Sequence, residues 1–349
     1  MKRTLNIIAL LAAGLSALLL GSCGKEISSR PGGSVRVTFV VETPATKGAM
    51  ASGGETAIHS LDLIVFRADG ALEGYVRTTE GETVSASLIA GEELTYYILA
   101  NLPAGRLSEV SSEDAFLSSM TYMTDMSATS MVMSGSGTLT LTPGSGEMQV
   151  GPVGLDRYAC KISITDITMD WLSDFVTKPS CVVNRVLVMN GRTAVPLSGT
   201  ATATADAYWI NKLTDEEADA DPASIIGALA YENLNVALPS AQTVALGSVV
   251  YAMPNSSTSE EIASDVPWAP RQTRVCLEIL VDGSPNWFSI SLPAMVRNMH
   301  YIVSDLVLTG PGTLEPDMGI DRTAVSFGVY VSPWDANEVD AGEFPLYNQ

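Results

Sequence analysis

Cys23 is the residue of this chain best placed for covalent chemistry. It follows a basic start, an apolar run over residues 7–20 and a small Gly-Ser pair. Such a series is typical of a secretory signal peptide, and the apolar run is too short for a stable transmembrane helix. Small residues directly before a cysteine resemble the lipobox of exported lipoproteins. We therefore expect residues 1–22 to be removed and Cys23 to carry lipid; ordinary signal cleavage beside an incidental cysteine is the alternative.

Lys47 is the second candidate for chemistry. The residues Thr46, Lys47 and Gly48 form a small polar run after Pro44, which ends a strand because proline has no N–H to give. Exposed runs of this composition are preferred sites of proteolytic cleavage. A trypsin-like protease could enter the chain here.

Catalytic and metal-binding patterns are poorly represented. His59 and His300 each stand at the edge of an expected strand, without a second ligand at metal-binding spacing, so we expect structural histidines. The nucleophile, zincin and phosphate-loop motifs do not occur. A carboxylate pair for glycoside hydrolysis stays open, but none of the 39 acidic residues stands out. An acidic cluster over residues 215–221 has no EF-hand spacing, which favours a solvated loop or a short capped helix over a calcium site. We expect no enzyme and no cofactor.

Cysteine is scarce, and the chain is acidic. If Cys23 is lipidated, Cys160, Cys181 and Cys276 remain, which allow at most one internal disulfide. Cys160 and Cys276 lie in apolar runs and are expected to be buried thiols; a bridge between Cys160 and Cys181 stays open. The net charge is −20, or −22 without the two basic residues of the leader. Such a surface repels nucleic acid and anionic lipid.

Two strands with similar apolar faces lie at opposite ends of the mature chain. Alternation with a period of two, in β-branched and aromatic residues, predicts both strands. The first face consists of Val35, Val37, Phe39 and Val41, and the last consists of Val325, Phe327, Val329 and Val331. We expect these two strands to compete for one groove.

The elements between them read as short strands separated by turn signals. At least a dozen such strands predict β-sandwiches. In the first half of the chain, only residues 108–120 have a helix-like pattern, with Ser111 or Ser112 as the cap. We predict a tether over residues 23–33, one β-sandwich domain over residues 34–153 and a second over residues 154–349.

Several segments, taken in order, resemble the FimA-type fimbrillins, a family of bacterial pilus subunits. The similar segments are the lipobox at Cys23, Val35–Thr43, Ser60–Phe66, Tyr97–Asn101, Arg157–Ile167, Asn298–Tyr301, Leu308–Thr313, Pro316 and Val325–Trp334. These are strand and turn residues, and their shared order over most of the chain carries the resemblance.

The resemblance implies two transthyretin-like β-sandwich domains in tandem, no catalysis and export as an outer membrane lipoprotein. It also implies proteolysis after the first strand and a final place in an extracellular fimbria that supports adhesion. The family usually has Arg at the cut, whereas this chain has Lys47 before Gly48. The implied partners are other fimbrial subunits, including anchor and tip proteins, and a trypsin-like processing protease.

Strand exchange is the polymerisation mechanism that fits this resemblance. If the first strand is an edge strand, its loss after cleavage leaves unpaired backbone groups over an open apolar core. The C-terminal strand of another subunit could fill that groove, which gives an open-ended fibre. A structural stalk subunit is the preferred interpretation. A fimbrial anchor or tip adhesin of the same family is the second, and a carbohydrate-binding surface lipoprotein is the third.

Overall fold

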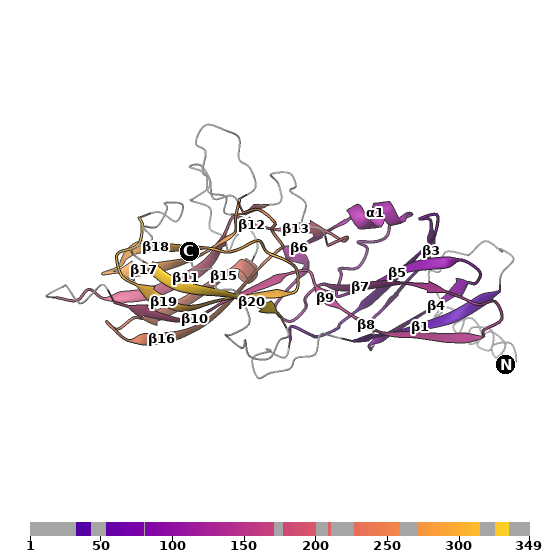
Figure 1. The fold of residues 1–349 in the computed structure, drawn as a ribbon, viewed down its shortest axis with the longest axis horizontal. Coiled ribbons are helices and arrows are strands. Elements are labelled where there is room, and N and C mark those ends of the chain that lie inside the picture. Colours follow the sequence, from indigo (N-terminus) through magenta and orange to yellow (C-terminus); the bar gives the residue numbers. More distant parts are fainter. Residues whose placement is uncertain are drawn as a thin grey trace, which may run out of the picture.

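The computed structural model describes residues 33–42, 54–79, 81–170, 177–199, 209–210, 227–258, 271–314 and 325–334. Within these ranges the chain is almost entirely β-structure, arranged as two sandwiches along one long axis (Figure 1). No helix in the described residues is long and apolar enough to cross a membrane. The predicted all-β class with two sandwiches in tandem is confirmed. Cys23, Lys47, Gly48 and the acidic cluster at 215–221 lie outside the described residues.

The first sandwich contains two sheets. Its strands are β1 Ser34–Glu42, β2 Leu61–Arg67, β3 Leu72–Thr78, β4 Thr83–Ile89, β5 Glu93–Ala100, β7 Met133–Thr140, β8 Glu147–Gly154 and β9 Asp156–Arg157. One sheet has the order β4-β1-β8, and the other has the order β3-β2-β5-β7-β9. The predicted boundary at 153/154 falls at the end of β8, just before β9 pairs with β7.

Between β5 and β7 lie the helix α1 Glu113–Ser118, the short strand β6 Met120–Tyr122 and the 3-10 turn η1 Met123–Asp125. The predicted helix is present but shorter than its pattern suggested. Ser112 caps it, because its side chain accepts a hydrogen bond from the backbone N–H of Ala115.

The second sandwich likewise contains two sheets, and each of these has four strands. Its main strands are β10 Cys160–Met169, β11 Cys181–Met189, β15 Tyr231–Ala237, β16 Thr243–Ala252, β17 Arg274–Val281, β18 Ser284–Ser291, β19 Met299–Leu308 and β20 Val325–Pro333. The sheets have the orders β16-β10-β19-β20 and β15-β11-β17-β18. The short elements are β12 Gly191–Arg192, β13 Ala194–Pro196, β14 Trp209–Ile210 and the 3-10 turn η4 Gly227–Ala230.

The two sandwiches repeat one topology. In each, the first strand lies between an antiparallel neighbour and a parallel one: β1 between β4 and β8, and β10 between β16 and β19. The opposite sheets correspond as well, since β3-β2-β5-β7 and β15-β11-β17-β18 are both antiparallel throughout. Seven strands are therefore equivalent in the two domains. Strand β20, which pairs with the outer side of β19, has no counterpart beside β8 in the described residues.

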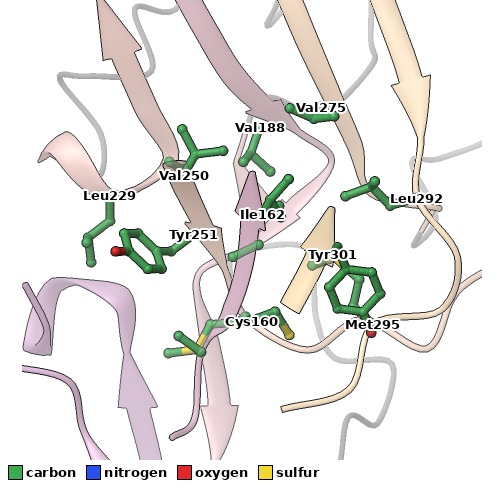
Figure 2. Packing of buried hydrophobic residues seen from close by; sticks show 14 of the residues in the cluster. Cys160, Ile162, Val188, Leu229, Val250, Tyr251, Val275, Leu292, Met295 and Tyr301 are labelled. Atoms are coloured by element: carbon green, nitrogen blue, oxygen red, sulfur yellow. The ribbon is translucent and has the colours of Figure 1, made fainter. Parts of the chain in front are cut away.

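Two hydrophobic cores hold this arrangement. The smaller core fills the first sandwich and includes all four apolar side chains of the β1 inner face. The larger core fills the second sandwich, where Ile162, Val188, Val250, Val275 and Tyr301 converge from five strands (Figure 2). It continues onto the α1 side of the first domain, so strand β2 is buried on both faces.

Strand pairing also joins the two domains. β6 of the first domain pairs antiparallel with β13 of the second. Continuous core and backbone pairing together indicate a subunit whose two halves act as one body.

Candidate functional site

Strand β1 is inserted in the middle of its sheet. It pairs antiparallel with β4 over Ser34–Val40 and parallel with β8 from Arg36 onwards. The interpretation of this segment as an edge strand is wrong, because β8, which begins at Glu147, pairs with the second side of β1. Periodicity in the sequence reports which side chains are buried but not which strands are neighbours. Removal of β1 would therefore expose two strand edges instead of one.

The inner face of β1 is completely buried. Val35, Val37, Phe39 and Val41 retain 1%, 0%, 0% and 3% of their accessible surface. The Phe39 ring packs on Tyr96 of β5, with 4.8 Å between ring centroids. On the outer face, the hydroxyls of Thr38 and Ser85 lie 2.8 Å apart and hydrogen bond across to β4. The strand is thus held by one core and two backbone ladders.

Strand β20 is held less completely. It pairs only with β19, and in the described residues its other side has no strand partner. Its inner face packs on the larger core, yet only Val329 is buried, at 2% exposure. The other three members of that face, Val325, Phe327 and Val331, are half-buried. These positions lie on one face of the strand, as the alternation predicted.

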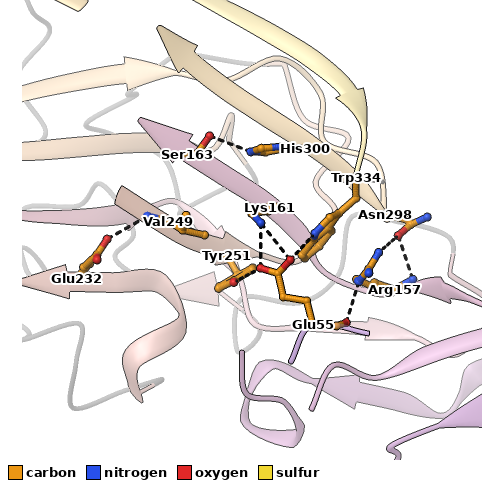
Figure 3. Close-up of polar contacts among 10 residues, drawn as sticks. All are labelled: Glu55, Arg157, Lys161, Ser163, Glu232, Val249, Tyr251, Asn298, His300 and Trp334. Carbon is orange, nitrogen blue, oxygen red and sulfur yellow. Dashed lines mark hydrogen bonds and ion pairs between the residues drawn. The ribbon is translucent and has the colours of Figure 1, made fainter. Parts of the chain in front are cut away.

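The end of β20 is bound to the buried carboxylate of Glu55, which lies two residues after the undescribed residues 43–53. The indole Nε1 of Trp334 donates to Glu55 Oε2 at 3.0 Å. Lys161 Nζ donates to both carboxylate oxygens at 3.0 Å, and the Tyr251 hydroxyl donates to Oε1 at 2.6 Å. Figure 3 shows these side chains converging on Glu55 from β10, β16 and the end of β20.

A second layer of contacts surrounds this cluster. The Arg157 guanidinium lies 4.7 Å over the Trp334 ring, and its Nε donates to the backbone oxygen of Glu55 at 3.1 Å. The Asn298 side chain accepts from Arg157 Nη1 at 3.1 Å. We call the set of Glu55, Lys161, Tyr251, Trp334 and Arg157 the Glu55 cluster. It joins the segment that begins at residue 54, the domain junction and the C-terminal strand.

The Glu55 carboxylate is held in its charged form. Burial alone would raise its pKa, but the hydrogen bonds from Tyr251 and Trp334 and the charge of Lys161 outweigh burial and lower the pKa below its ordinary value. At 2% exposure the carboxylate depends on these donors, because a buried charge without partners is costly.

Sequence reasoning did not find this cluster. Glu55 lies in a Gly-rich stretch with no periodic pattern, and its partners come from three distant segments. The isolated acidic residue between two apolar strands is a weak signal that could have drawn attention to it.

His300 is a structural histidine of β19, as predicted. Its Nε2 lies 2.8 Å from the Ser163 hydroxyl on the neighbouring strand β10. Burial, with the nearby charge of Lys161, lowers the pKa of His300 to about 4. His59 is exposed and lies 2.9 Å from the Thr129 carbonyl.

The folded protein is expected to lose stability as the pH falls from 7 to 5. An unfolded histidine has a pKa of about 6.5, so acid protonates His300 in the unfolded chain first. The stability that neutral His300 contributes is complete above pH 6.5 and is lost as the pH falls toward 4. Denaturant unfolding should show a loss of about 2 kcal/mol between pH 7 and 5. This loss should be absent in His300→Gln and present in His59→Gln; an equal loss in both variants would contradict the assignment.

The cysteines and acidic residues supply no further site in the described ranges. Cys160, Cys181 and Cys276 are buried free thiols, so the open question of a Cys160–Cys181 bridge is answered in the negative for this structure. In the part of the chain that the structure describes, no three His, Cys, Asp or Glu side chains could hold a metal ion.

The sequence of the first domain matches a known family. Residues 33–159 match the family model of the major fimbrial subunit protein (FimA). A search of curated proteins gives no significant match. The match covers the whole first sandwich, and it confirms the predicted resemblance for the strand and turn residues of that domain.

Solved structures show a likeness in fold that extends over both domains. The fimbrilin (FimA) of Porphyromonas gingivalis W83 is 15% identical, with a TM-score of 0.61 over 86% of this chain and 97% of that one. A candidate cell adhesion protein of Bacteroides eggerthii DSM 20697 is 15% identical, with a TM-score of 0.64 over 88% and 98%. Another from Parabacteroides distasonis ATCC 8503 is 16% identical, with a TM-score of 0.61 over 86% and 100%.

The class of this protein follows from these findings. It has the two-sandwich fold of solved fimbrilins, and its first domain carries the sequence pattern of the FimA family. The fold is therefore that of solved fimbrilins over most of the chain, and the match to the FimA family is confined to residues 33–159.

Proposed function

We propose that this chain is a polymerising stalk subunit of a surface fimbria, in which β20 of one subunit takes the place of β1 in the next. One observation carries the proposal. β20 is an additional edge strand on the second sandwich, whereas the first sandwich has the same seven-strand topology without such a strand in the described residues. A subunit that gives up β20 therefore keeps seven paired strands in its second domain. A subunit that loses β1 has a groove open on both sides.

The energy of the joint favours exchange. Burying four apolar side chains in the groove contributes roughly 6–12 kcal/mol relative to a fully exposed strand, at about 1.5–3 kcal/mol each, before ordering costs and the loss of contacts with β19. Backbone bonds to β4 and β8 add about 0.5–1.5 kcal/mol each. In its own subunit the inner face of β20 is only half-buried, except for Val329, which is buried. The corresponding side chains of β1 are almost completely buried. Val325, Phe327 and Val331 thus gain burial when they move.

Export and processing prepare the groove. Signal cleavage and lipidation at Cys23 bring the precursor to the outer membrane, and a trypsin-like protease then cuts between Lys47 and Gly48. The cut frees β1 together with the lipid anchor, and the trimmed subunit joins an extracellular fimbria. Its partners are further copies of itself and the anchor and tip subunits; the acidic surface disfavours nucleic acid.

Blocking the cut is expected to keep the subunit monomeric. In Lys47→Ala, β1 stays covalently attached, and its insertion from within the same chain outcompetes a strand from another subunit. N-terminal sequencing should find Gly48 as the first residue of the wild-type surface form and should find only the longer precursor in the variant. A variant that still begins at Gly48 would show that the site is wrong.

Two complementary variants test the proposed function. Chains cut at Lys47 and lacking residues 323–349 can accept a strand but cannot donate one. Uncut Lys47→Ala chains can donate but cannot accept. Each alone should remain monomeric, and a mixture should form 1:1 dimers and nothing larger in light scattering. Long polymers from either variant alone, or no dimer in the mixture, would overturn the proposal.

A further inference from the structure

The donor strand could enter the groove in the direction of β1 or in the reverse direction, and the order of residues in β1 and β20 distinguishes the two. We infer that β20 enters the groove in the reverse direction to β1, antiparallel to β8 and parallel to β4, with Phe327 in the place of Phe39. This inference rests on the proposed function and adds the polarity and register of the joint. Two independent observations support it.

The first observation is the order of the apolar residues. Along β1 the inner face reads Val, Val, Phe, Val, and along β20 it reads Val, Phe, Val, Val. Inserted in the same direction with all four positions filled, β20 would place Phe327 in the space of Val37 and leave the space of Phe39 to a valine. A shift of two residues would align the phenylalanines but leave the space of Val35 without one of the four. Inserted in reverse, all four positions match in residue type.

Volume makes this difference matter. Phe39 has 0% exposure and its ring packs on Tyr96, while Val37 has 0% exposure in the same core. A valine in the Phe39 space leaves a cavity, and a phenylalanine in the Val37 space overpacks the core. Both errors destabilise a close-packed interior. The reversed strand avoids both, because it places phenylalanine against Tyr96.

The second observation is the repeat of topology within the chain. β20 already pairs with β19, and it does so antiparallel over Met299–Leu308. β19 is the equivalent of β8, since both are the parallel neighbours of their domain's first strand. In the reversed direction β20 keeps with β8 the antiparallel relation that it has with β19. The order of residues and the order of strands therefore give the same polarity.

Polarity can be measured by cysteine pairing. β1 pairs Val40 with Thr83 and Arg36 with Ser87 on the outer face of β4. In reverse, Ser326 takes the place of Val40 beside Thr83; in the same direction it takes the place of Arg36 beside Ser87. Ser326, Thr83 and Ser87 are all exposed. Thr83 and Ser87 are four residues apart, about 13 Å along a strand, so one cysteine cannot reach both.

The experiment uses a peptide of residues 321–334 that carries Ser326→Cys, added to Lys47-trimmed protein under mild oxidation. The protein carries either Thr83→Cys or Ser87→Cys, and its native thiols in the described residues are buried. We expect the disulfide to form at least ten times faster with Thr83→Cys. Untrimmed protein with the same substitutions is the control and should form neither.

The outcomes separate the two proposals. Faster linkage to Ser87→Cys would overturn the reversed polarity but leave strand exchange intact. Peptide binding without linkage to either position would also overturn the inference, because the strand would lie elsewhere. Failure of the unmodified peptide to bind trimmed protein would overturn the proposed function itself.

Discussion

Glu55→Ala should destabilise the subunit by about 3–5 kcal/mol, the typical cost of removing one partner from a buried ion pair. The change leaves the Lys161 ammonium, at 7% exposure, without its carboxylate, and it removes the acceptor of the Tyr251 hydroxyl and the Trp334 indole. The free energy of unfolding in urea measures this loss. Hydrogen exchange should be faster in β20, because its end is no longer fastened.

Control variants separate the buried cluster from general effects of charge. Glu147→Ala removes an exposed carboxylate from β8 and should change stability by less than about 0.5 kcal/mol. Glu55→Leu combined with Lys161→Met removes both charges and should recover much of the loss. A Glu55→Ala subunit as stable as the wild type would contradict the role of the Glu55 cluster.

The contribution of Glu55 should also depend on pH. The pKa of the folded carboxyl lies below the unfolded value of about 4.3. Its stabilisation is therefore complete above that value and is lost as the pH falls through the lower folded pKa. This window lies below the one in which His300 titrates, so the two effects can be measured separately.

Phe327→Asp in the donor peptide should reduce binding to trimmed protein by about 150-fold or more, equivalent to about 3 kcal/mol. The substitution would bury a carboxylate without a partner in the space beside Tyr96. Phe327→Leu keeps an apolar side chain and should lose far less. Ser326→Asp, on the exposed face of the strand, should bind nearly as well as the unmodified peptide. Titration calorimetry measures all three, and equal losses for the first and last would contradict a buried Phe327.

Alternation allowed much of this fold to be predicted. The four inner positions of β1 and the inner face of β20 follow from period-two patterns in β-branched and aromatic residues. The buried β2 follows from its continuous apolar run, and Ser112 follows from the preference of serine for helix caps. These features are local, so the sequence determines them within a few residues.

The features that could not be predicted depend on contacts between distant segments. β1 is central because β8, more than a hundred residues later, pairs with its second side. The repeat of seven strands has no visible sequence signal, since equivalent strands share a pattern but not residues. The Glu55 cluster joins positions 55, 161, 251 and 334. No periodicity encodes which of many acidic residues will meet a buried lysine.

Strand exchange in the β1 groove is tested most directly by binding of the unmodified peptide of residues 321–334 to two forms of the same protein. One form is cut at Lys47 and the other is uncut, and both are titrated under identical conditions. The proposed mechanism predicts tight binding to the cut form and no measurable binding to the uncut form, whose own β1 fills the groove. Equal affinity for both forms would place the peptide outside the groove and contradict strand exchange.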